Sequence, residues 1–240
     1  MSRQAEFTTE LCRFPEAERL MTNWLASLER RCLVWLAGRL PPWIRPDHLT
    51  ILALLAMFVT GLSYYAAGTT PRALWLAIAG LGINWFGDSL DGTVARVRHQ
   101  QRPRYGFYVD HLIDCLGASF VFGGLALSGY MSPLIAMSLL VAYLLLSIEV
   151  YLATYCLTVC RLSFWGLGPT ELRLLLIAGT LALFSDPTVQ LVGHRYRLFD
   201  VGGIVAMICI GVTFIISSVR NVRVLHQAER ISAATAEEVP

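Results

Sequence analysis

Long runs of apolar residues, separated by short charged segments, set the fold class of this 240-residue chain. Hydrophobic residues make up 55% of it and charged residues only 15%, well below the roughly 25% charged residues of soluble globular domains. Several runs reach the roughly 20 residues that an α-helix needs to cross a hydrocarbon core of about 30 Å. We therefore expect an all-α integral membrane bundle of six transmembrane helices, at approximately 49–67, 72–90, 106–129, 132–160, 170–185 and 201–219.

The arginines predict how these spans are oriented. All 19 basic residues are arginine, and an even number of spans places both termini on one side. Thirteen arginines lie near span ends on that side, namely Arg30, Arg31, Arg39, Arg45, Arg96, Arg98, Arg102, Arg104, Arg161, Arg173, Arg220, Arg223 and Arg230. Only Arg72, Arg195 and Arg197 lie near the opposite ends. Because cytoplasmic loops carry the excess of basic residues, we expect both termini and the 91–105 loop in the cytoplasm, and a bacterial inner membrane as the location.

The segment before the first predicted span is amphipathic. Residues 15–40 place Leu20, Trp24, Leu28 and Trp35 at helical spacing, which favours a helix lying in the membrane interface over a soluble helix packed on a domain. This leader lacks the apolar core and small-residue cleavage site of a signal peptide, so we expect it to be retained. The expected organisation is a cytoplasmic leader with the interfacial helix at 1–45, a six-helix catalytic domain at 46–220 and a cytoplasmic tail at 221–240.

Four aspartates stand beside these apolar runs. Asp88 and Asp91 are three residues apart at the cytoplasmic end of the second span. Asp110 and Asp114 are four apart at the start of the third span, so each pair shares a helix face. Counted from Gly106, Asp114 lies roughly 12 Å into its helix, which is membrane depth. An aspartate at a helix centre costs roughly 2.5 to 3.5 kcal/mol, so we expect a cation among these carboxylates.

The clustered carboxylates predict a metal site. Carboxylates are hard oxygen ligands that suit Mg²⁺, Mn²⁺ or Ca²⁺, whereas zinc favours histidine or cysteine. Two divalent ions a few ångströms apart are the arrangement that stabilises an in-line phosphoryl displacement. The cluster therefore indicates a site that handles phosphate.

Small residues near the aspartates favour the same interpretation. Gly92 lets a ligand approach the backbone beside Asp91, and Ala95 places no large side chain on that helix face. Gly106 leaves space where the third span begins. Each glycine taken alone is equally typical of a helix end. Arg96 is suited to clamp a pyrophosphate, while the other arginines of the loop are more typical of topology determinants.

These residues form one motif, which resembles the signature of the CDP-alcohol phosphotransferases, also called CDP-alcohol phosphatidyltransferases: D88-x2-D91-G92-x2-A95-R96-x9-G106-x3-D110-x3-D114. Eight fixed positions over 27 residues make the match specific. The resemblance implies an enzyme of phospholipid synthesis that moves a substituted phosphate from a CDP-alcohol to a second alcohol and releases CMP. It also implies two divalent ions, Mg²⁺ or Mn²⁺, and a homodimer.

The resemblance assigns roles to the motif residues. Asp88, Asp91 and Asp110 are expected to be the principal metal ligands. Asp114 is expected to deprotonate the acceptor hydroxyl as the general base and also to touch a metal. The cytidine and diphosphate pocket is expected to be lined by Gly92, Ala95 and Arg96, with Gly106 giving steric room.

One segment departs from the family pattern. Members often carry a Pro-Asn-x-x-Thr-like entry to the first span that approaches the nucleotide. Here Pro46 to Thr50 is similar, but Asp47 replaces the asparagine. The alternative is that Asp47 only caps the start of a helix.

Three further residues have open roles. Glu149 lies inside the fourth span, where it is expected to line the acceptor pocket, bind an amine or bond to a neighbouring helix. Glu171 and Arg173 open the fifth span, either in acceptor recognition or as ordinary helix-start residues. His111 points about 100° away from Asp110 around the helix, which favours packing over catalysis.

The leading functional prediction is phosphatidyl transfer from CDP-diacylglycerol to a small polar alcohol. The alternative within the enzyme class is donation from CDP-choline or CDP-ethanolamine to diacylglycerol. In a different class, the acidic cluster of a non-catalytic membrane protein would only bind divalent cations, but ion binding has no need for the Gly-x2-Ala-Arg insert. The net charge of +2 is too small to suggest a nucleic acid partner.

Overall fold

The computed structural model is mostly helical and describes residues 18–20, 26–157, 159–161, 169–191 and 193–237. Its elements in chain order are β1 (Glu18–Leu20), α2 (Ala26–Arg39), α3 (Pro46–Ala67), the 3₁₀ turn η1 (Pro71–Ala73), α4 (Leu74–Val97), α5 (Pro103–Leu127), α6 (Pro133–Leu157), β2 (Val159–Arg161), α7 (Pro169–Ala182), β3 (Thr188–Leu191), β4 (His194–Arg197) and α8 (Leu198–Glu237).

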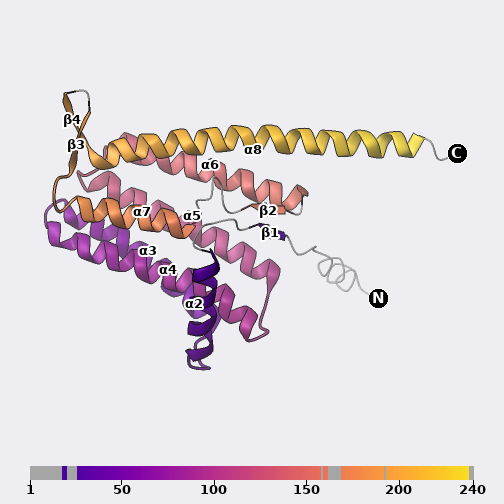
Figure 1. Ribbon diagram of the computed structural model, residues 1–240, viewed down its shortest axis with the longest axis horizontal. Coiled ribbons are helices and arrows are strands. Elements are labelled where there is room, and N and C mark those ends of the chain that lie inside the picture. The colour runs from indigo at the N-terminus through magenta and orange to yellow at the C-terminus, as the bar shows by residue number, and fades with distance from the viewer. Residues whose placement is uncertain (1–17, 21–25, 158, 162–168, 192, 238–240) are drawn as a thin grey trace, which may run out of the picture.

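The long helices run side by side, and α2 crosses them near one end (Figure 1). The central helix α3 packs between α4 and α5, while α6 lies between α5 and α8, and α7 packs on α4. Two short strand pairs were not predicted. β1 pairs with β2 in parallel, and β3 and β4 form an antiparallel hairpin with Thr188 opposite Arg197. This hairpin lies at the opposite end of the bundle from the 91–105 loop (Figure 1).

Among the described residues, five helices are long and apolar enough to cross a membrane. They are α3, the η1–α4 unit, α5, α6 and α8, so a mostly helical membrane protein is confirmed. The fifth predicted span, 170–185, corresponds to α7. This helix has 14 residues, about 21 Å at the standard rise, which is less than a hydrocarbon core of about 30 Å. The count of six spans is therefore not confirmed.

The helix predicted at 15–40 is shorter than expected. The described helix α2 begins at Ala26, Leu20 belongs to β1, and Trp24 lies outside the described residues. Residues 18–20 of the predicted helix pair in parallel with β2 instead, because a distant segment supplies backbone partners that periodicity does not report. α2 buries Leu33 and Ala37, whereas Trp35 is exposed and has the Arg39 guanidinium 3.7 Å from its ring centre.

Two glycines bring α3 and α5 into backbone contact. A Cβ on Gly61 would lie 2.1 Å from the Phe120 carbonyl oxygen, and one on Gly124 would lie 2.0 Å from the Gly61 carbonyl oxygen. Only residues without side chains permit this approach. The contact fixes the position of α5, and with it the helix that carries Asp110 and Asp114.

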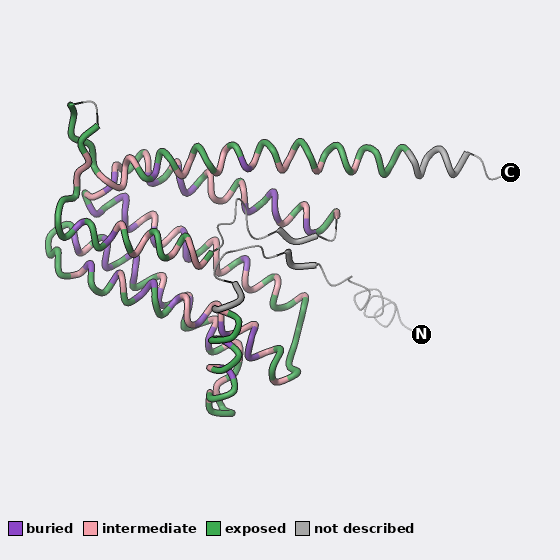
Figure 2. The backbone as a smooth tube through the Cα atoms, viewed as in Figure 1, coloured by how far each residue is buried: buried purple, intermediate pink, exposed green. Residues whose placement is uncertain are grey.

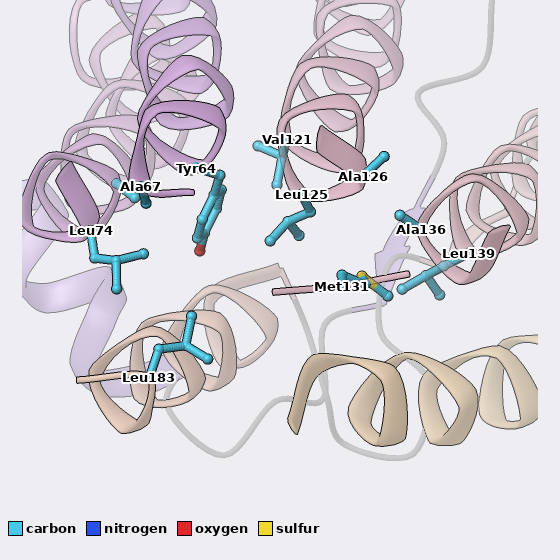
Figure 3. Packing of buried hydrophobic residues seen from close by; sticks show 11 residues of the cluster. Tyr64, Ala67, Leu74, Val121, Leu125, Ala126, Met131, Ala136, Leu139 and Leu183 are labelled. Carbon is cyan, nitrogen blue, oxygen red and sulfur yellow. The ribbon is translucent and has the colours of Figure 1, made fainter. Parts of the chain in front are cut away.

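The main apolar core lies among α3, α4, α5 and α6. Figure 3 shows Tyr64 of α3 and Leu125 of α5 pointing into this interior, with Met131 and Leu183 beside them. The Tyr64 hydroxyl lies 2.7 Å from Oγ1 of Thr180, which joins α3 to α7 by a buried hydrogen bond. The outward faces and most of α8 are exposed (Figure 2), as expected for helices that meet lipid.

Replacing Gly124 by alanine should destabilise the bundle, because the new methyl group would collide with the backbone of α3. Overpacking of this kind costs about 1 to 3 kcal/mol. The neighbouring Gly123 has no atom within 4 Å of the position that a Cβ would take, so Gly123→Ala is the matched control. Thermal unfolding of the detergent-solubilised protein, followed by size-exclusion chromatography, should give a lower midpoint for Gly124→Ala only. Equal midpoints would contradict the close α3–α5 contact.

Candidate functional site

The four aspartates face one another across the joint between α4 and α5. Asp88 and Asp91 lie in the last three turns of α4, and Asp110 and Asp114 lie in the first half of α5. Asp91 interacts electrostatically with Asp88 and Asp110, and Asp114 interacts with the other three. The structure thus brings together all four residues that the motif predicted to act as one cluster.

Arg173 of α7 brings a positive charge to this cluster. Its Nη2 donates a hydrogen bond of 2.5 Å to Oδ2 of Asp88, and its side chain is only 12% exposed. Its Nη1 is buried and has no hydrogen-bond acceptor among the described residues. Arg173 also interacts electrostatically with Asp114, so one guanidinium offsets charge on both helices of the site.

Asp91 is held by α3 and by its own helix. Its Oδ2 accepts a 2.6 Å hydrogen bond from the Thr50 hydroxyl, and its Oδ1 accepts one from the Gly92 backbone amide. The Thr50 oxygen also lies 3.1 Å from the Pro46 carbonyl. Since a hydroxyl has one proton, the shorter contact to the carboxylate is the better candidate for the donated bond. The entry segment of the first span therefore reaches the site through Thr50.

Asp47, the residue that departs from the family pattern, points elsewhere. Its Oδ1 accepts a hydrogen bond from Nη2 of Arg102 in the loop between α4 and α5. This hydrogen bond to the carboxylate raises the pKa of the Arg102 guanidinium. The contact ties the start of α3 to the loop, and no side-chain cap by Asp47 is present at the start of α3.

The residues expected to line a nucleotide pocket lie on the last turns of α4 and the first turn of α5. Arg96 is exposed, and its Nη2 donates a 3.1 Å hydrogen bond to Oγ1 of Thr93. Its Nη1 lies 3.5 Å from the position a Cβ on Gly92 would take, so this guanidinium covers Gly92. Ala95 is half-buried, and the space around Gly106 is open for at least 4 Å.

Gly92 and Gly106 differ in their place within the helices. α4 continues five residues beyond Gly92 to Val97, so the interpretation of Gly92 as a helix-end residue is wrong. Gly106 does lie at a helix end, in the first turn of α5, which begins at Pro103. A role of either glycine in making room for a ligand stays a prediction.

His111 and Glu149 lie outside the carboxylate cluster. The His111 ring is buried against Phe107 and Tyr151, with centroid separations of 4.1 and 4.5 Å, and its Nδ1 lies 2.6 Å from the Phe107 carbonyl oxygen. This environment fits the predicted packing role, since it joins α5 to α6.

Glu149 joins α6 to α8. Its Oε1 accepts hydrogen bonds from Ser217 at 2.8 Å and from Asn221 at 2.6 Å. The third of its predicted roles, a hydrogen bond to a neighbouring helix, is therefore the one that the structure contains.

Sequence reasoning missed three residues of this region. Thr50 was noted only as part of the entry segment, and Glu29 and Tyr143 had no assigned role. Glu29 contacts α4 and α7, while Tyr143 of α6 lies close enough to Asp114 to interact with it electrostatically. A hydroxyl or a lone acid gives no periodic signal, so only the three-dimensional contact identifies these residues.

The donor chemistry of the cluster fits hard divalent cations, because four carboxylates from two helices supply only oxygen atoms. As the side chains stand, no three histidine, cysteine, aspartate or glutamate residues within the described part of the chain converge on a common metal position. In this arrangement Asp88 is bonded to Arg173 and Asp91 to Thr50. The metal ligands therefore remain a prediction.

Comparison with known proteins places this geometry in context. A family model described as CDP-alcohol phosphatidyltransferase matches residues 43–219. The chain is 34% identical over 96 residues to cholinephosphotransferase 1 of Gallus gallus, an alignment that covers 38% of this chain and 28% of that protein. The chain thus spans less than a third of the length of this curated relative.

A solved structure shares the fold. The crystal structure of phosphatidylinositol phosphate synthase from Mycobacterium tuberculosis with CDP-DAG bound matches with a TM-score of 0.54 and 21% identity. The match covers 80% of this chain and 92% of that one. At this identity the likeness concerns the arrangement of the helices alone.

The family model covers the entry segment, the aspartate motif and all the helices from α3 to the first half of α8. The resemblance that the motif indicated is therefore confirmed. This chain belongs to the CDP-alcohol phosphatidyltransferase family of membrane enzymes.

Proposed function

We propose that this protein transfers a phosphatidyl group from CDP-diacylglycerol to a small polar alcohol and releases CMP. The observation that carries the proposal is the meeting of four carboxylates on α4 and α5 with the buried guanidinium of Arg173. Carboxylates suit the cations that accompany a diphosphate, and a guanidinium suits the anionic groups of the same substrate. Membership in the family supports this chemistry.

We assign metal binding to Asp88, Asp91, Asp110 and Asp114. Two Mg²⁺ or Mn²⁺ ions bound there would supply charge neutralisation for the diphosphate and for the departing CMP. Thr50 holds Asp91 by its hydrogen bond and so orients one ligand from α3. Arg173 holds Asp88 in the same way from α7.

Asp114 is the proposed general base. It accepts the proton of the acceptor hydroxyl while the hydroxyl oxygen forms a bond to phosphorus and the bond from phosphorus to CMP breaks. Its position beside the other three carboxylates supports this role, because an acceptor alcohol there would lie next to both the proposed metals and the base. Gly92, Ala95 and Arg96 line the proposed cytidine and diphosphate pocket, and Gly106 leaves room at its entrance.

A second candidate is transfer from CDP-choline or CDP-ethanolamine to diacylglycerol. The name of the chicken relative, cholinephosphotransferase 1, favours it over part of the chain. An ammonium headgroup requires a carboxylate or an aromatic cage. One oxygen of Glu149 accepts two hydrogen bonds from α8, while the other is buried and has no hydrogen-bond partner among the described residues. At the aspartates, Arg173 is bonded to Asp88 and brings a positive charge that would repel an ammonium group. We therefore keep CDP-diacylglycerol as the leading donor.

Turnover with defined donors tests this assignment. Purified protein with Mg²⁺ or Mn²⁺ and radiolabelled CDP-diacylglycerol should form a new phospholipid with one member of a panel of small alcohols. Chelation of the metal should abolish the product. Product formation only from CDP-choline or CDP-ethanolamine with diacylglycerol would overturn the leading donor and favour the second candidate.

Asp114→Asn should abolish CMP release and leave binding of the CDP-alcohol largely intact, because the amide keeps the shape of the side chain but cannot accept the proton. Loss of a general base typically lowers the rate by about 10² to 10⁴. The measurement is CMP release together with donor binding by the same variant. Normal turnover would remove Asp114 from the role of base.

Thr50→Val should weaken metal binding, because it removes the hydrogen bond that orients Asp91. Loss of a residue that orients a metal ligand typically costs about 10 to 100-fold in metal affinity or activity. Titration with Mn²⁺, with free ion followed by electron paramagnetic resonance, measures the change. Thr50→Ser retains the hydroxyl and should bind as the wild type does. Ser63→Ala removes a hydroxyl of α3 that bonds only its own helix, at the Val59 carbonyl, and should also have no effect.

We further propose six membrane spans, the fifth at 170–185, which includes most of α7, with the aspartates opening to the cytoplasm. The expected division into a leader at 1–45, a catalytic domain at 46–220 and a tail at 221–240 belongs to this proposal, as does a homodimer in the membrane. The arginine distribution supports the orientation. α8 itself continues without a break past residue 220.

The orientation predicts that a cysteine replacing Gln100, in the loop between α4 and α5, reacts with a membrane-impermeant thiol reagent only from the cytoplasmic side. Labelling is measured in intact cells, where the reagent reaches only the outer face of the membrane, and in inverted vesicles, where it reaches only the cytoplasmic face. The cysteine-free parent protein is the control. Labelling in intact cells would reverse the topology.

A further inference from the structure

Glu29 of α2 joins three helices through one carboxylate oxygen. Its Oε1 accepts a 2.8 Å hydrogen bond from the Trp85 indole and a 3.3 Å bond from the Ser89 hydroxyl, both on α4. The same oxygen accepts a 2.7 Å hydrogen bond from the Thr170 hydroxyl in the first turn of α7. A partly buried carboxylate is costly unless it is hydrogen-bonded, so three donors on one oxygen make this a specific contact.

The residues that Glu29 contacts adjoin the proposed catalytic residues. Ser89 follows Asp88 on α4, and Thr170 precedes Arg173 by three residues on α7. Residues three apart share a helix face, so Thr170 and Arg173 both face α4. Two polar connections therefore link α4 to the first turns of α7, one through Glu29 and one directly from Arg173 to Asp88.

Hydrogen bonds join α7 to other helices near both of its ends. It has only 14 residues, and its other half is joined to α3 by the hydrogen bond between Thr180 and Tyr64. Contacts near both ends thus fix the height and rotation of the helix. Of these two contacts, the hydrogen bond from Thr170 to Glu29 lies nearer to Arg173 than the one between Thr180 and Tyr64.

α2 is held to α4 without Glu29. Leu33 and Ala37 pack with Leu90 and Val94 in a small apolar core. At the far end of α2, the Arg98 guanidinium donates hydrogen bonds to backbone carbonyls, including that of Leu40 at 2.8 Å. Loss of the Glu29 carboxylate should therefore leave α2 in place and change mainly the position of α7.

We infer that Glu29 is a positioning residue, which sets α7 so that Arg173 meets Asp88 and the anionic donor. The inference rests on the proposed function for its effect on turnover. The structural part of the inference, that the position of α7 depends on Glu29, is independent of the proposed function.

The kinetic test compares Glu29→Ala with Glu29→Gln, which keeps an acceptor oxygen. For Glu29→Ala we expect the KM for the CDP-alcohol to rise about tenfold, the lower end of the range for residues that act through a ligand-orienting neighbour. Glu29→Gln should recover most of the loss. The exposed neighbour Arg30, changed to Gln, is the matched control and should leave KM unchanged.

A double-mutant cycle separates positioning from general destabilisation. In the Arg173→Ala background, Glu29→Ala should cause no further rise in KM, because the residue through which it acts is gone. Additive effects of the two substitutions would overturn the inference.

A spin label gives a readout that does not need activity. In a cysteine-free background, a label replacing the exposed Leu172 reports the first turns of α7, and one replacing the exposed Leu134 of α6 is the control. Glu29→Ala should increase mobility at 172 but not at 134. Unchanged mobility at 172 would overturn the inference whatever the enzyme does. If the wild type turns over no donor, the proposed function fails, and the label alone decides whether Glu29 positions α7.

Discussion

Electrostatic repulsion among four neighbouring carboxylates is the constraint on which the rest of the bundle depends. Charges that interact weakly in water interact several-fold more strongly where the effective dielectric constant is lower, so each carboxylate needs compensation. The described structure supplies it from other helices. Arg173 of α7 meets Asp88, and Thr50 of α3 meets Asp91. The site is therefore a property of four helices, although its motif occupies only two.

Close helix packing makes this compensation possible. A Cβ on Gly87 would lie 2.6 Å from the Leu49 carbonyl oxygen, so α3 and α4 touch at the backbone immediately before Asp88 and Thr50. A larger residue at 87 would separate the two helices and carry the Thr50 hydroxyl away from Asp91. The small residues of this chain thus act at a distance from the chemistry, because they set the spacing across which polar side chains must reach.

The features that follow from local sequence, namely the location of the long apolar helices and the helix faces of the aspartate motif, could be predicted. Hydropathy identified five helices that are long and apolar enough to span, and the spacing of Asp88, Asp91, Asp110 and Asp114 identified two helix faces that meet. The boundaries were less accurate. Leu20 lies in a strand because it pairs with Arg161, and the helix found at the predicted 170–185 span, α7, has only 14 residues. Hydropathy averages over a window and reports neither a distant strand partner nor where a helix stops.

The pairwise contacts could not be predicted, and Arg173 illustrates why. Counted by position, it belongs with the arginines that orient the membrane spans, most of which are expected at lipid headgroups. Its side chain is only 12% exposed and bonded to Asp88, so its charge serves the interior of the protein. Glu29 is the converse case, since an acid on an amphipathic helix is normally assigned to the solvent face. Both residues owe their roles to partners more than 55 positions away, and a single sequence carries no signal for such pairs. What a single sequence does contain is the charge imbalance of four clustered acids, which requires that compensating groups exist and directs the search for them to the helices beside the motif.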